Sequence, residues 1–112
     1  MKNPTPAEAK RYLAVVTPEW KAFWFHKGPV VKSLKELLSA LPKVPAQMFE
    51  HHVNSTKNDL AAWVKDVVGD ADLAVELKTA KTVKAAMESI DQRLKQLDKS
   101  MVVVAPRMKT KK

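Results

Sequence analysis

Residues 33–42 read Ser-Leu-Lys-Glu-Leu-Leu-Ser-Ala-Leu-Pro, and this stretch decides the fold class. Ser33 followed by Glu36 is a capping box, a reciprocal pair of side-chain hydrogen bonds that begins many helices. Pro42 cannot continue a helix and marks its end. Between them, apolar residues recur at the spacing of one helix face, at Leu34, Leu37, Leu38 and Leu41. We therefore expect an amphipathic helix over residues 34–41 with its leucines in a core.

A similar pattern lies on the N-terminal side. Thr5 and Glu8 form a second capping box, with Pro6 at the first helical position, where its missing N–H costs nothing. We expect a helix from there to about Val16, buried through Ala9, Leu13 and Val16. Thr17-Pro18-Glu19 repeats the start pattern, but the aromatic run that follows fits either a helix or a short extended segment at residues 23–28.

Three further short helices are expected on the C-terminal side. Pro45 opens the first, which runs through Phe49 and Val53. Asn58 or Asp59 caps the second, and Gly69 supplies its left-handed stop. Asp70 then caps the third. The inward-facing positions of the last two helices are expected to be Leu60, Trp63, Val64, Val67, Leu73 and Leu77.

From residue 83 onward, apolar residues follow the spacing of a coiled-coil seam. They are Val83, Met87, Ile90, Leu94, Leu97 and Met101, spaced 4, 3, 4, 3 and 4 residues apart. This seam fits packing on the protein's own domain, and it also fits a homodimer or a protein partner bound through residues 83–101. The apolar, β-branched residues 101–104 predict an extended strand after the helix.

These patterns predict an all-α fold, a compact bundle of five or six short helices. A chain of 112 residues is long enough for one modest core and too short for a second independent domain. We expect a single helical domain over residues 1–101, followed by an extended segment and a basic tail over residues 102–112.

Four short motifs in a fixed order resemble a small prokaryotic, largely archaeal domain family of unknown function. They are FWFHKG at residues 23–28, SLKELL at 33–38, FEHHVN at 49–54 and KNDLAAWVKDVVGD at 57–70. The family-like core covers about residues 20–98. The resemblance implies a fold and no activity, and it implies that residues 52–54 form a structural motif at a helix end.

Composition excludes several classes of protein. The chain has 46% hydrophobic and 29% charged residues, as folded proteins do, and no cysteine, which excludes disulfides and thiolate chemistry. No apolar run approaches the roughly 20 residues that span a bilayer. The last helix mixes both signs of charge, which disfavours a membrane surface. Residues 1–10 lack the apolar segment of a signal peptide, so we expect a cytoplasmic protein without a membrane partner.

The net charge of +8 is concentrated at the two ends of the chain. Residues 1–32 carry six Lys or Arg against two Glu, and residues 81–112 carry nine against three acids. Residues 33–68 carry four of each sign, and residues 69–80 carry one Lys against three acids. Such ends are suited to a polyanion.

Neither a metal site nor a catalytic site is expected. His51 and His52 are adjacent, and neighbouring helical residues point about 100° apart, so both rings cannot readily hold one ion, even with His26, Glu50 or Asp59 nearby. Asn58, Asp59, Asp66 and Asp70 are acidic or amide residues, but capping already accounts for most of them. Because no nucleophile or phosphate loop accompanies them, we predict that the protein is not an enzyme and needs no cofactor.

The preferred function is nucleic-acid association with little sequence specificity. The aromatic residues Trp20, Phe23, Trp24 and Phe25 are expected to place two or three rings in the core, and Trp24 or Phe25 beside Lys27 is expected to stack on a base. The basic tail could equally serve only solubility. The predicted nucleic-acid-binding residues are Lys2, Lys10, Arg11, Trp24, Phe25, Lys27, Arg107, Lys109, Lys111 and Lys112. The alternative is a protein–protein adaptor or dimerisation module acting through the C-terminal helix.

Overall fold

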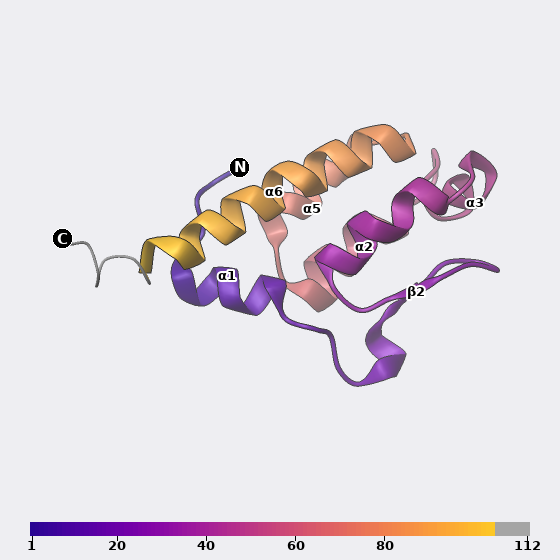
Figure 1. Ribbon diagram of the computed structural model, residues 1–112. Helices are drawn as coiled ribbons and strands as arrows, with labels where there is room; N and C mark the ends of the chain where they lie inside the picture. Colours follow the sequence, from indigo (N-terminus) through magenta and orange to yellow (C-terminus); the bar gives the residue numbers. More distant parts are fainter. Residues whose placement is uncertain (105–112) are drawn as a thin grey trace.

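The computed structural model describes residues 1–104 of the chain, and it is mostly helical (Figure 1). Within those residues, one two-stranded hairpin accompanies the helices, so the fold is mostly helical without being purely α. The α-helices are α1 (Pro6–Leu13), α2 (Leu34–Ala40), α3 (Ala46–His52), α4 (Asp59–Trp63), α5 (Ala71–Lys78) and α6 (Val83–Val104). The other elements are η1 (Glu19–Lys21), β1 (Phe23–Trp24), β2 (Val30–Val31), η2 (Leu41–Lys43) and η3 (Val64–Val68), a π-helical turn.

The predicted helix starts are confirmed by their capping hydrogen bonds. Thr5 and Glu8 form the complete capping box of α1. At the start of α2 only half of the predicted capping box forms. The Ser33 hydroxyl accepts a 3.1 Å hydrogen bond from the Glu36 amide, but the Glu36 carboxylate accepts from the Lys32 amide at 2.8 Å instead of from Ser33. Asn58, rather than Asp59, caps α4, and its side-chain amide also donates to the Leu77 carbonyl at 2.8 Å. That second bond ties α4 to α5.

Helix α1 is shorter than predicted. It ends at Leu13, and Ala14 already has an extended backbone conformation. Tyr12 joins Ala9 in the core, while Leu13 and Val16 are only partly buried. The chain leaves the helix because the Val16 amide donates a 2.7 Å hydrogen bond to the Lys32 carbonyl, which draws this segment alongside the entry to α2. A long-range contact of this kind cannot be read from local spacing.

The hairpin settles the element that the sequence left open at residues 23–28. Strand β1 pairs antiparallel with β2, with Phe23 opposite Val31 and Trp24 opposite Val30. Because successive side chains of a strand point to opposite faces, Phe23 and Phe25 are buried while Trp24 is exposed. Lys27 adopts a left-handed conformation in the turn, with φ of 57°.

Helix α6 packs on its own domain, against α1, α2 and α5 (Figure 1). Ile90, Leu94 and Leu97 of the predicted seam are buried, whereas Val83 and Met87 are only partly buried. The extended segment predicted after residue 101 is wrong for residues 102–104, because α6 continues to Val104. Extending an existing helix adds a hydrogen bond per residue without a new nucleation step, which outweighs β-branched preference here. The tail over residues 105–112 lies outside the described residues.

A buried ion pair anchors the N-terminal segment to α6. The Arg93 guanidinium donates two hydrogen bonds to the Asp70 carboxylate, at 2.7 and 2.8 Å, and both side chains are almost fully buried. Arg93 also donates to the Lys2 carbonyl at 2.7 Å. Gln96 donates to the Met1 carbonyl and to the Asn3 side chain. The chain start therefore lies beside the middle of α6, although Asp70 was predicted only as a helix cap.

Candidate functional site

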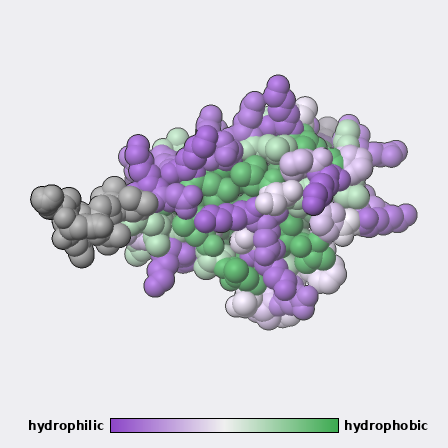
Figure 2. All heavy atoms as spheres, viewed as in Figure 1, coloured by the Kyte–Doolittle hydropathy of each residue, from purple (hydrophilic) through white to green (hydrophobic). Residues whose placement is uncertain are grey.

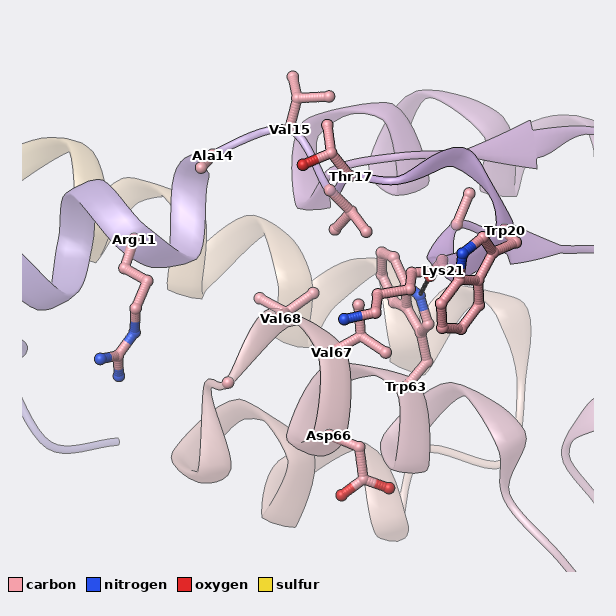
Figure 3. Close-up of a pocket in the computed structure, with 13 residues that line it drawn as sticks. Arg11, Ala14, Val15, Thr17, Trp20, Lys21, Trp63, Asp66, Val67 and Val68 are labelled. Carbon is pink, nitrogen blue, oxygen red and sulfur yellow. Dashed lines mark hydrogen bonds between the residues drawn. The ribbon is translucent and has the colours of Figure 1, made fainter.

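An open cleft of about 600 Å³ lies between the segment that follows α1 and the π-helical turn η3 (Figure 3). Polar and apolar surface line it in similar amounts. One wall is η1, which brings a tryptophan and a lysine to the opening. The lining residues are Arg11, Ala14, Val15, Val16, Thr17, Trp20, Lys21, Ala22, Trp63, Asp66, Val67, Val68 and Gly69.

Trp20 is the most exposed aromatic side chain described, with 74% of its surface accessible to solvent. The Lys21 ammonium lies 5.4 Å from the centre of the Trp20 ring, within the range of a cation–π contact. Trp63 is buried on the same side of the fold, and its indole N–H donates a 2.8 Å hydrogen bond to the Lys21 carbonyl. That bond fixes η1 to α4 and so fixes where Trp20 and Lys21 stand.

Arg11 stands at the opposite end of the cleft from Trp20 (Figure 3). Its guanidinium lies 5.1 Å from the centre of the Tyr12 ring and donates a 3.4 Å hydrogen bond to the Tyr12 hydroxyl. Gly69 ends η3 with φ of 94°, and a side chain there would lie 3.8 Å from the Arg11 Nε atom. The left-handed turn therefore favours glycine here, whereas a side chain would make only ordinary van der Waals contact with the arginine.

The structure separates the predicted nucleic-acid-binding residues into three groups. Lys2, Lys10, Arg11 and Lys27 are exposed, and Trp24 is 56% exposed, so each can meet a ligand. The prediction for Phe25 is wrong as a contact residue, because only 4% of it is exposed and its ring packs edge-on against Phe23. Arg107, Lys109, Lys111 and Lys112 lie outside the described residues.

Only one of the predicted binding residues, Arg11, lines the cleft. The residues that face it across the opening, Trp20 and Lys21, were missing from the predicted set. Sequence position offered a partial indication, because Trp20 and Lys21 belong to the same aromatic and basic run as Trp24. The choice between those tryptophans depends on strand alternation and on η1, which the sequence left open.

The histidines form a structural cluster beside the hairpin. His52 is buried, and its Nε2 atom accepts a 2.9 Å hydrogen bond from the His26 amide. Its Nδ1 atom lies 3.0 Å from the Asp59 carboxylate, so Nδ1 carries the proton and donates it there. Burial opposes ionisation of Asp59, but the hydrogen bonds from His52 and Lys57 outweigh it and lower the pKa of that carboxyl.

His51 lies on the exposed side of this cluster. Its ring stacks on His26 at 4.0 Å between ring centres. Desolvation, followed by repulsion from His26 and His52, lowers the pKa of His51. Among residues 1–104, no group of three or more His, Cys, Asp or Glu side chains is placed to hold a metal ion. The cluster instead holds the turn of the hairpin against α3.

No helix in the described part of the chain is both long and apolar enough to cross a membrane. Comparison of the chain with protein-family models, with curated proteins and with solved structures gave no match. The resemblance to a domain family of unknown function therefore stays a prediction.

Proposed function

We propose that this protein is a non-enzymatic, cytoplasmic nucleic-acid-associated protein with little sequence specificity. The observation that carries the proposal is a set of exposed cations without an acidic partner. In residues 1–32 the set consists of Lys2, Lys10, Arg11, Lys21 and Lys27. Within residues 1–104, none of these side chains has a carboxylate within the 4.0 Å of an ion pair. Binding a polyanion would neutralise them and release condensed counterions.

Some cations elsewhere in the fold have acidic partners, whereas others within residues 1–104 are also exposed and unpaired, namely Lys43, Lys65, Lys78, Lys81, Lys84 and Lys99. Lys35 lies 3.8 Å from Asp98, and Lys95 lies 3.1 Å from Asp91. A carboxylate beside each lysine reduces the electrostatic attraction between that lysine and a phosphate. We propose the N-terminal third of the fold for the phosphate contacts, because residues 1–32 carry six Lys or Arg against two Glu. By sequence alone, we add the tail cations Arg107, Lys109, Lys111 and Lys112.

The proposal is tested by the salt dependence of binding to random-sequence DNA and RNA. The logarithm of the association constant should fall against the logarithm of salt concentration, with a slope of about −0.7 to −0.9 per phosphate neutralised. Lys10→Gln combined with Arg11→Gln should flatten the slope by up to about two units. Lys35→Gln combined with Lys95→Gln removes the same charge from paired sites and should change the slope less.

Deleting residues 107–112 tests the tail. The deletion removes four positive charges and should flatten the slope by up to about 3.6 units. An unchanged slope would assign the tail to solubility. If the full chain is not retained on either nucleic acid at low salt, the proposed function is wrong. It is also wrong if the double variant at Lys10 and Arg11 and the double variant at Lys35 and Lys95 lose affinity equally.

A second candidate function is self-association through α6, favoured by an apolar groove. The groove has a volume of about 640 Å³, and Leu38 of α2 and Val83 and Met87 of α6 form its apolar part. The face that carries α2 and α6 shows a band of hydrophobic atoms between hydrophilic side chains (Figure 2). Leu38 was expected in the core, but it is only partly buried at this groove.

The charges along this groove suit a second copy of the chain. Two α6 helices packed antiparallel about Met87 would place Lys84 of each copy opposite Asp91 of the other, since both residues line the same groove. Met87→Asp should turn a dimer into a folded monomer, measured by light scattering after gel filtration. Lys84→Glu should weaken the dimer, and adding Asp91→Lys should restore it. A parental monomer at all accessible concentrations would remove this candidate.

A further inference from the structure

We infer that the cleft beside η1 binds an unpaired base of a single-stranded nucleic acid, stacked on Trp20, with the adjoining phosphates near Arg11 and Lys21. This inference rests on the proposed function and adds the class of nucleic acid and the place of a base. It does not depend on the tail or on the groove at α6.

The exposure of Trp20 is the first support. Tryptophan is highly buried on average because it presents a large apolar surface, yet three quarters of Trp20 is in solvent. Trp63, which lines the same cleft, is buried and has its N–H bonded to the Lys21 carbonyl, so it serves the fold. Trp20 stands at the opening of the cleft on a wall that Trp63 holds in place (Figure 3). Its position is thus fixed while its ring remains available.

The shape and lining of the cleft are the second support. Small-molecule sites commonly measure about 300–1,000 Å³. The cleft measures about 600 Å³, and its lining mixes apolar side chains such as Val16, Val67 and Val68 with polar ones in similar proportion. A nucleobase has apolar faces and a polar edge, which suits such a mixed lining. Base–aromatic stacking tolerates any base because every base has a π-face.

The need for a free base face selects a single strand. In a continuous duplex, each base is stacked on both sides, so none of its faces can reach Trp20 unless it leaves the stack. An unpaired base carries no such cost. A duplex can still contact the exposed lysines through its phosphates, because those contacts need no base.

The charges around the cleft orient the strand. Figure 3 shows the Lys21 ammonium beside Val67 and Arg11 at the far end of the cleft beyond Val68, and both cations are without an ion-pair partner among the described residues. Asp66 is the one acid in the lining, and its side chain extends from η3 away from Lys21 (Figure 3). A phosphate would avoid Asp66 and run along the side that carries the two cations.

The test uses the full chain and a fluorescently labelled, mixed-sequence single strand, with relaxed closed-circular duplex as competitor because it has no free ends. Fluorescence anisotropy at low salt gives the affinity for each. Trp20→Ala should weaken binding of the single strand by about 5- to 150-fold. Binding of the duplex should change by less than about twofold, since its phosphate contacts remain. Trp20→Phe keeps a ring and should recover part of the loss.

Two comparison variants make the result specific. Val75→Ala removes an exposed apolar side chain on α5 that does not line the cleft, and it should leave both affinities unchanged. Trp24→Ala removes the other exposed tryptophan and should weaken the single strand less than Trp20→Ala does. Circular dichroism of every variant should match the parent, because neither Trp20 nor Trp24 is in the core.

The outcomes separate this inference from the proposed function. If the parent binds neither nucleic acid, the proposed function fails, and this inference fails with it. If the parent binds both equally and Trp20→Ala changes neither, the proposed function stands and the base site is wrong. If Trp24→Ala has the larger effect on the single strand, the base stacks on the hairpin and the cleft assignment is overturned.

Discussion

Removing the carboxylate of Asp70 should destabilise the protein more than any other single change at a polar residue. The Asp70 side chain both pairs with Arg93 and caps α5. Its oxygens accept two hydrogen bonds from the Arg93 guanidinium and one from the Leu73 amide. In Asp70→Ala the Arg93 guanidinium, only 2% exposed, would keep its charge without a counterion. Breaking a buried pair costs about 3–5 kcal/mol, and losing an N-cap costs about 1 kcal/mol more.

The expected change in melting temperature follows from the size of the chain. An unfolding entropy of about 2.1 cal/mol/K per residue means that 1 kcal/mol lowers the melting temperature of a domain this size by about 4 °C. Asp70→Ala should therefore lower it by roughly 16–24 °C. Asp70→Asn retains an oxygen to cap α5, so its melting temperature should fall by less than that of Asp70→Ala. The assay is thermal unfolding followed by circular dichroism at neutral pH.

A double-mutant cycle isolates the ion pair. Arg93→Met removes the buried charge, so Asp70→Ala combined with Arg93→Met should cost less than the sum of the single changes by more than about 1 kcal/mol. Proteolysis near residue 2 should increase in Arg93→Met, because the Lys2 carbonyl loses its donor. A shift below about 4 °C for Asp70→Ala, or additive single changes, would refute the burial of this pair.

Three further outcomes test other parts of the structure. Asp66→Asn should tighten binding to single-stranded nucleic acid at low salt, and weaker binding would mean that Asp66 itself contacts the ligand. Leu94→Asp places an unpaired charge in the core and should unfold the chain in circular dichroism, whereas a folded product would mean that this face of α6 is not buried. Because the pKa of His51 is lowered in the fold, the unfolded chain binds more protons below about pH 6.5, so stability should fall as pH drops through the folded-state pKa. His51→Gln should reduce the dependence of the melting temperature on pH between about pH 7.5 and 5. An unchanged dependence would mean that His51 is not its cause.

Residue order alone determined where most helices begin. The caps at Thr5, Ser33 and Asn58 and the stop at Gly69 were predictable because capping is a local interaction between residues only a few positions apart. Heptad spacing likewise identified the buried positions Ile90, Leu94 and Leu97 of α6, since side-chain direction in a helix depends on position along it, although Met101 of the same seam is exposed. The absence of cysteine and the concentration of positive charge at the ends are also properties of composition.

Tertiary structure decided which of these residues act together. Asp70 and Arg93 are 23 residues apart, and their pairing arises only when α5 and α6 pack. Phe25 became core and Trp20 became surface because the hairpin alternates its faces and because Trp63 fixes η1 through a contact 42 residues along the chain. The cleft needs α1, η1 and η3 in one place, and the path of the chain between helices depends on such long-range contacts. Local propensity does not encode them, since each one forms only after distant segments have been brought together in the fold.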